Sequence, residues 1–418
     1  MASHNSLLAL KGGRPAVPEA LGKEHHPQLS ERMRQLVLSQ LTDQISIYDN
    51  GGIYERLESA LKEKWNLPSA LTVNSGTTAL YTMFYGAGLV PGDEVIVPSY
   101  TFFATATPLF PLGVRPVLAD CLDNGNIDPD SVAALVSVRT KAVVCTHMWG
   151  IPCDMDELQA VASKAKILLL EDSSHAHGAL YRGKVVGSFA DGSAWSLQGK
   201  KLLTAGEGGL YSTRHKEHYE RAILIGHFNK RAKKEVYSSK FLPFTTTGTG
   251  LNFRMHPLGA ALAYSQIETF DEQLSQRRQI AQVLTYELSK IDGLRVPHIP
   301  AGAEPAWYAF PILYNAAAFP GVSKEVFVRA VHAEGAVEVD IPGSTCPLSK
   351  HPLFRTPGDF LRDSGSGTLE MCAIANAERY HGAVIKLPCF HGALRYEQAQ
   401  AYVAAISKVA ASRGELAE

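Results

Sequence analysis

The sequence predicts an α/β protein with a mainly parallel β-sheet covered by helices on both faces. Two observations predict it. From about residue 55 onward, short apolar runs alternate with segments in which apolar residues recur at helical spacing. The runs are apolar throughout, which is typical of strands buried on both faces. With 418 residues, 45% of them hydrophobic, the chain is long enough for a large domain and a smaller one.

Each element is assigned from its local pattern. The first helix is expected at 55–65, where ERLESALKEKW has apolar residues at helical spacing. The helix at 154–165 carries acidic residues in its first turn, where they favour the helix dipole. The strands are expected at 70–76, 93–99, 115–120, 141–150, 166–172 and 193–198. Further helical turns are expected within 101–113 and at 128–137.

The pattern loosens after Gly209. The segment 226–250 is basic and rich in turn residues, so we expect an exposed excursion there. One long helix is expected at 256–291, and the last helices at 323–335 and 395–412. The chain is therefore expected to form an N-terminal segment (1–30), a large α/β domain (31–265), and a connecting helix with a small α+β domain (266–418).

Composition excludes several function classes. The formal net charge of -1 gives no field that would favour nucleic acid or an anionic membrane. No apolar run approaches the roughly 18 residues of a spanning helix, and MASHNSLLALKGG does not resemble a secretory signal. The six cysteines lack a paired C-x-x-C spacing, so we expect reduced thiols, no metal site and a cytoplasmic protein.

Asp172 ends the apolar run KILLLED, at the sheet edge where ligands bind in open parallel sheets. A buried carboxylate there needs a positive partner. That partner is either an ordinary cap or arginine ion pair, or the protonated nitrogen of a heterocyclic ligand.

The segment VNSGTTAL places Ser75, Gly76 and Thr77 between a strand and a helix, where N–H groups and hydroxyls can hold a phosphate. An ordinary N-cap explains the same residues. The segment does not match the nucleotide-binding glycine motifs. Phe102 or Phe103, just past another strand, either stacks on a planar ring or belongs to the core.

The segment SLQGKKLLTAGEGG pairs Lys200 and Lys201 before a glycine-rich turn. A lysine that reacts with a carbonyl needs a pKa lowered by burial or by neighbouring cations, although surface lysine pairs are also common. Pyridoxal phosphate requires such a lysine, a carboxylate at its ring nitrogen, a phosphate cup and a stacking group. The conjunction of all four predicts this cofactor.

The chain also resembles the fold-type I DegT/DnrJ/EryC1/StrS aminotransferases, in motifs that recur in order: NSGTTAL, VIVPSYTFFATA, HMWGIPCDMDEL, EDSSHAHGALYRGKVVGSFAD, SLQGKKLLTAGEGG and GLNFRMHPLGAALAYSQI. The resemblance implies that Lys201, rather than Lys200, binds the cofactor covalently. Asp172 would pair with the ring nitrogen, His175 would lie near the phenolic oxygen, and Phe102 would stack on the ring. The residues implied for the phosphate are Gly76, Thr77, Ser196 and, from the other subunit of a homodimer, Asn252, beside the Ser75 that the strand-to-helix segment itself suggests.

The resemblance implies transfer of an amino group, with glutamine or another α-amino acid as donor, to a keto-cyclitol or keto-sugar in antibiotic biosynthesis. The leader LLALKGGRP and HAHGA favour inosose aminotransferases within the family. The alternative is a lyase of the aminohydroxybenzoate synthase type. A cofactor-bound protein without catalysis and a nucleic-acid patch in the basic segment are less favoured. Trp149 and the basic insert 229–247 depart from the family pattern and leave the substrate open.

Overall fold

The computed structural model describes residues 7–23, 26–361 and 374–416. Its large sheet has seven strands in the order β1-β10-β9-β6-β5-β2-β4, which confirms the predicted α/β class. The pairs from β9 through β4 are parallel, and β10 and β1 join antiparallel at one edge. The strands are β1 (Leu71–Val73), β2 (Glu94–Pro98), β4 (Arg115–Ala119), β5 (Thr140–Thr146), β6 (Leu168–Asp172), β9 (Gly192–Ser196) and β10 (Gly209–Thr213).

Helices cover both faces of this sheet because its strand residues alternate between two apolar clusters. Ile96 and Val143 pack on the face of α2, α5 and α8, whereas Val95 and Val144 pack on the face of α3 and α6. The helices of this part are α1 (Glu31–Thr42), α2 (Ile53–Trp65), α3 (Gly76–Gly86), α4 (Pro129–Leu135), α5 (Met155–Ala165), α6 (Lys216–Gly226), α7 (Asn229–Glu235) and α8 (Pro257–Ser265). The strands are therefore buried on both sides, as their composition predicts.

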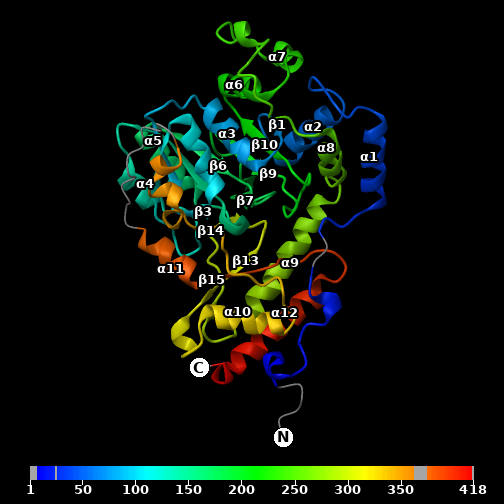
Figure 1. The fold of residues 1–418 in the computed structure, drawn as a ribbon, viewed down its shortest axis with the longest axis vertical. Coiled ribbons are helices and arrows are strands. Elements are labelled where there is room, and N and C mark those ends of the chain that lie inside the picture. Colours follow the sequence, from blue (N-terminus) through cyan, green and yellow to red (C-terminus); the bar gives the residue numbers. More distant parts are fainter. Residues whose placement is uncertain (1–6, 24–25, 362–373, 417–418) are drawn as a thin grey trace.

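A second, three-stranded antiparallel sheet lies between the large sheet and the end of the molecule opposite α7 (Figure 1). It has its own apolar cluster, which includes Leu8 and Val17 of the N-terminal segment. The helix α9 runs from the region of the large sheet toward this cluster (Figure 1). The elements here are β11 (Leu294–Arg295), β13 (Phe310–Tyr314), β15 (Val384–Leu387), α9 (Phe270–Leu288), α10 (Lys324–Ala333), α11 (Ala375–Ala383) and α12 (Arg395–Ala411).

Short strands connect the two parts. The pair of β3 (Tyr100–Phe102) and β14 (Thr345–Pro347) joins the segment after β2 to the C-terminal part of the chain. A small antiparallel sheet contains β7 (Leu180–Tyr181), β8 (Lys184–Val185) and β12 (Ala303–Glu304). Within the described ranges, no helix combines the length and the apolar character that crossing a membrane requires.

The prediction of one long helix at 256–291 is wrong, because α8 ends at Ser265 and α9 begins at Phe270. At the break, Gln266 Nε2 donates to the carbonyls of Leu262 and Thr204, and its Oε1 accepts from the Thr204 N–H. The break thereby fastens the loop that follows Lys201. The helical turns expected within 101–113 are 3₁₀ turns, since Pro108 and Pro111 cannot donate the hydrogen bonds of an α-helix.

The basic segment is only partly an exposed excursion. It projects with α6 and α7 at one end of the molecule (Figure 1). However, Arg231 of α7 is buried, where its guanidinium forms two hydrogen bonds, of 3.0 and 2.8 Å, with the Glu58 carboxylate. Arg231 thus connects α7 to α2 inside the protein. The basic residues beside it in the sequence do not predict this buried contact.

Candidate functional site

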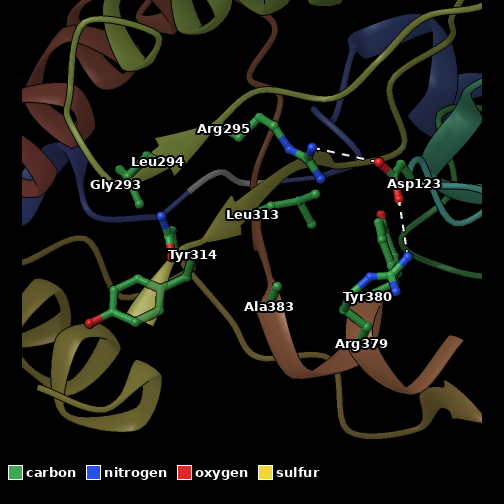
Figure 2. A pocket seen from close by; sticks show the side chains of 10 residues that line it. Asp123, Gly293, Leu294, Arg295, Leu313, Tyr314, Arg379, Tyr380 and Ala383 are labelled. Atoms are coloured by element: carbon green, nitrogen blue, oxygen red, sulfur yellow. Dashed lines mark ion pairs between the residues drawn. The ribbon is translucent and has the colours of Figure 1, made fainter. Parts of the chain in front are cut away.

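A cavity of about 350 Å³ lies where β5, β6 and β9 end and α3 begins. Eight residues that the sequence singles out line it: Ser75, Gly76, Thr77, Phe102, Asp172, His175, Ser196 and Lys201. Asn252 does not line it; it is exposed, and its carbonyl accepts a hydrogen bond of 3.4 Å from Asn74. Another cavity, of about 390 Å³, contains an ion-paired Asp123 between Arg295 and Arg379 (Figure 2), but no residue predicted for the site.

Asp172 is 4% exposed at the carboxyl end of β6. One carboxylate oxygen accepts from the Thr105 hydroxyl at 2.7 Å, and the other accepts from the Ser174 N–H at 3.1 Å. Within the described residues, no cation lies at ion-pair distance from Asp172. Because a buried carboxylate is costly without a countercharge, the site is suited to a ligand that brings a positive group.

Lys201 is 8% exposed, and its Nζ lies 4.1 Å from the centre of the Tyr308 ring. Burial, opposed by the charge on Asp172, lowers the pKa of the amine to about 7, and Lys386 adds to the lowering. Near neutral pH a large fraction of this amine is therefore unprotonated and nucleophilic. Lys200 is exposed and lines a neighbouring cavity instead.

Two histidines of HAHGA have different surroundings. His175 stacks on Tyr308, with ring centres 4.0 Å apart, and its buried Nδ1 has no hydrogen-bond partner among the residues that the structure describes. His177 Nε2 donates to the Ser196 carbonyl at 3.0 Å, and its Nδ1 accepts from the Leu203 N–H at 3.4 Å. Burial, together with the charge on Lys201, lowers the pKa of His177 to about 3, which agrees with a neutral ring. His177 thus holds both ends of the segment that carries Lys201.

The N-terminus of α3 forms one wall of the cavity. Ser75 caps the helix by accepting from the Thr78 N–H at 3.0 Å. A β-carbon at Gly76 would lie 2.5 Å from the Ser196 β-carbon, so only glycine allows this close approach. The free N–H groups of the first turn and the hydroxyls of Thr77 and Ser196 make this corner suitable for a phosphate.

Several residues that line the cavity are not predicted from the sequence. Tyr308 precedes β13, Lys386 belongs to β15, and Lys386 pairs with Asp340 at 3.0 Å. They come from the C-terminal part of the chain, and their local sequence carries no chemical signal. Trp149, identified as a departure from the family pattern, does line the cavity, whereas no residue of the basic insert 229–247 does.

The burial and the chemistry of the residues that line the cavity fit pyridoxal phosphate. Asp172 is a buried carboxylate without a countercharge, and His175 has an orphaned buried nitrogen. A β-carbon at Gly76 would fill the corner between the start of α3 and Ser196, and Lys201 supplies a buried amine. Each feature meets a requirement of the cofactor: a ring nitrogen, a polar ring substituent, a phosphate and a carbonyl.

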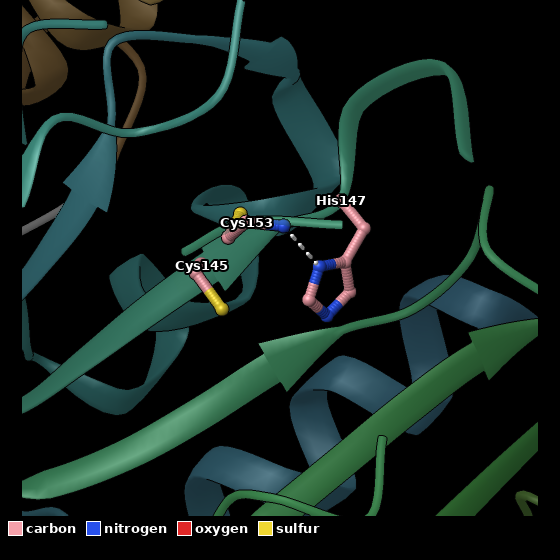
Figure 3. Close-up of side chains that lie close together, drawn as sticks. All are labelled: Cys145, His147 and Cys153. Atoms are coloured by element: carbon pink, nitrogen blue, oxygen red, sulfur yellow. Dashed lines mark hydrogen bonds between the residues drawn. The ribbon is translucent and has the colours of Figure 1, made fainter. Parts of the chain in front are cut away.

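Folding also gathers three potential metal ligands that the spacing in sequence does not reveal. The ligand atoms of Cys145, His147 and Cys153 lie within 4.8 Å of one another in the core (Figure 3). However, His147 Nδ1 accepts from the Cys153 N–H at 3.0 Å, so its Nε2 carries the proton and donates to Glu171 at 3.0 Å. Both ring nitrogens are thus occupied, and the cluster is a hydrogen-bonded part of the core.

Comparison with known proteins agrees with this chemistry. Residues 28–407 match the profile of the DegT/DnrJ/EryC1/StrS aminotransferase family. A putative L-glutamine:3-amino-2,3-dideoxy-scyllo-inosose aminotransferase of Streptoalloteichus tenebrarius is 31% identical, over 84% of this chain and 83% of its own. The 3-amino-5-hydroxybenzoate synthase of Amycolatopsis mediterranei is 35% identical, over 56% of this chain and 58% of its own. The crystal structure of an aminotransferase from Psychrobacter cryohalolentis superposes with a TM-score of 0.81 at 25% identity, covering 94% of this chain and 99% of that one.

Proposed function

The chain belongs to the DegT/DnrJ/EryC1/StrS aminotransferase family, and from this we propose that it moves an amino group from glutamine, or another α-amino acid, to a keto-cyclitol. As a member of the family it is a pyridoxal-phosphate-dependent sugar or cyclitol aminotransferase, with an amino donor and a keto acceptor as substrates. The observation that carries the proposal is the buried Lys201 amine in one cavity with Asp172, which lacks a countercharge.

When bound, pyridoxal phosphate supplies an electrophilic carbon and a ring that withdraws electrons. Lys201 would hold it covalently, and its released Nζ would take the proton from the donor's α-carbon and deliver it during transfer. The Asp172 carboxylate would keep a proton on the ring nitrogen. Phe102 would stack on the ring, His175 Nδ1 would contact a polar ring substituent, and the corner of Ser75, Gly76, Thr77 and Ser196 would bind the phosphate.

We propose a keto-cyclitol over a keto-sugar as acceptor, in the biosynthesis of an antibiotic or a similar secondary metabolite. The leader LLALKGGRP and the motif HAHGA support this choice, as does the name of the relative from S. tenebrarius. We also propose that two chains form the active sites, with Asn252 acting on the phosphate of the partner subunit. Its exposure outside the cavity of its own chain supports this role.

Two half-reactions test the proposal. Purified protein loaded with pyridoxal phosphate should convert to the amino form of the cofactor when glutamine is added, which absorbance follows directly. The amino form should then revert with inososes, and glutamine labelled at the α-nitrogen should label the product. If no α-amino acid produces the amino form, the proposed reaction is wrong; if only nucleotide-linked keto-sugars reverse it, the acceptor is wrong.

A lyase of the aminohydroxybenzoate synthase type is the second candidate, because the synthase of A. mediterranei is 35% identical over 56% of this chain. The same Lys201 and Asp172 would serve such a reaction, so the residues themselves do not separate the two. Accumulation of the amino form separates them, since a lyase does not take nitrogen from the donor.

A further inference from the structure

A second cavity, of about 380 Å³, adjoins the candidate active site. Tyr308, Asp340 and Lys386 line both cavities, so a molecule bound near Lys201 can extend from one into the other. The second cavity is also lined by Lys200 and by Arg277 of α9. The active-site chemistry assigned above uses neither of these two cations.

Arg277 is 4% exposed and has no anionic partner in the described ranges. Its Nη1 donates to the Trp307 carbonyl at 3.2 Å, and its Nε donates to His391 Nδ1 at 3.4 Å, both neutral acceptors. Within the described part of the chain, no carboxylate lies at ion-pair distance from Arg277 or from Lys200. A buried guanidinium without a countercharge is costly, and its planar fork matches a carboxylate or phosphate.

The neighbouring charges favour an anion in the same place. Burial raises the pKa of the Tyr308 hydroxyl; the positive charges of Lys200 and Arg277 act against the rise, and the charge of Asp340 adds to it. Asp340 and Glu338 also line the cavity, but Asp340 is engaged with Lys386. The Lys and Arg side chains that line the cavity carry three positive charges, and its two carboxylates carry two negative charges, so these groups have a net charge of +1.

We propose that this cavity is an oxyanion subsite of the active site, built around Arg277 with Lys200 and Lys386 beside it. It binds an anionic group of a substrate: the carboxylate of the amino donor, or a phosphate that the acceptor carries away from its reacting carbon. This inference rests on the proposed function and adds to it the site that recognises the negative charge of a substrate.

Direct binding tests the subsite without turnover. Holoenzyme, in which the cofactor occupies the phosphate corner, is titrated calorimetrically with glutarate and with inorganic phosphate. We expect one of the two to bind, Arg277→Gln to weaken binding about tenfold or more, and Lys200→Gln to weaken it severalfold. Arg278→Gln is the matched control, because this neighbouring arginine lines neither cavity and pairs with Glu304 at 3.0 Å.

Lys200 is exposed, so Lys200→Gln decides the matter if Arg277→Gln fails to fold. Failure of both probes to bind wild-type holoenzyme would overturn the proposal, as would equal binding by wild type and both variants.

The two half-reactions identify the source of the anion. If Lys200→Gln raises the glutamine concentration needed for half-maximal conversion and leaves the limiting rate unchanged, the subsite binds the donor carboxylate. The same effect on the keto acceptor alone assigns it to an acceptor phosphate. An effect on neither contradicts the subsite. Absence of any amino form in the wild type would instead refute the proposed reaction, while the calorimetric result would stand by itself.

Discussion

The Lys201 amine faces the Tyr308 ring at 4.1 Å, and no described carboxylate lies at ion-pair distance from it. The attraction between the aromatic ring and the protonated amine is weaker than the free-energy cost of removing water from the charged amine. The structure therefore keeps this lysine in an environment that favours its neutral form, and its pKa falls to about 7.

Replacing this lysine should change how the stability of the cofactor-free protein depends on pH. The pKa of Lys201 is about 7 in the folded chain and 10.5 ordinarily, so the unfolded chain binds more protons between these values. Wild-type stability therefore rises with pH across this window. Lys201→Met should be more stable than wild type by ~4 kcal/mol at pH 6, and by about half as much at pH 9.

Urea unfolding at the two pH values measures the difference. Lys200→Met is the matched control, because Lys200 is exposed and should show no such gap. A constant gap between Lys201→Met and wild type from pH 6 to pH 10 would show that the amine is not buried as described.

Gly76→Ala should disrupt the corner proposed for the phosphate. The new β-carbon would lie 2.5 Å from the Ser196 β-carbon, so α3 and β9 would have to separate. We expect a loss of about 1–3 kcal/mol in stability and a cofactor affinity at least about tenfold weaker. Cofactor titration by fluorescence measures the second effect. Gly414→Ala, where nothing lies within 4 Å of the added carbon, should leave the affinity unchanged.

The α/β class could be predicted because its signal is local. Each parallel strand is buried on both faces and is therefore an uninterrupted apolar run, as in β2 and β6. The break between α8 and α9 could not be predicted, because it depends on hydrogen bonds between Gln266 and Thr204, 62 residues apart in sequence. Periodicity reports the face that a helix buries and not the tertiary contact that ends it.

The candidate site shows the same division. Asp172 and Ser75 stand at ends of predicted strands, so topology alone brings them to one sheet edge. Tyr308 and Lys386 reach the cavity from the C-terminal part of the chain, and neither has a sequence neighbour of catalytic character. Arg277 is likewise hidden in a helix that reads as amphipathic. That no described carboxylate pairs with Arg277 can be recognised only from the three-dimensional structure.

Asp172→Asn tests the charge proposed to act on the ring nitrogen. Asparagine keeps the size and can still accept from the Thr105 hydroxyl, but it removes the negative charge. We expect the cofactor to remain bound and the donor half-reaction to slow by about 100-fold or more. Stopped-flow absorbance with glutamine gives the rate. Asp128→Asn, which alters only the cap of α4, should react at the wild-type rate; a comparable rate in Asp172→Asn would exclude the assigned role.

The buried pair of Glu58 and Arg231 makes the final prediction, which concerns the basic insert. Glu58 also accepts from the N–H and the hydroxyl of Thr72, so its carboxylate joins α2, β1 and α7. Glu58→Gln removes one of the two carboxylates that pair with the buried Arg231 guanidinium and leaves Glu235, at 2.9 Å, as its countercharge. We expect a cost of about 1–3 kcal/mol in urea unfolding. The double variant with Arg231→Met should lose less than the two single losses combined, because it removes the guanidinium together with the Glu58 carboxylate that it binds. Glu287→Gln breaks the exposed pair with Lys290 and should give no measurable change. Additive losses in the double variant would mean that α7 is held by other contacts, and that the insert is the independent excursion its composition suggests.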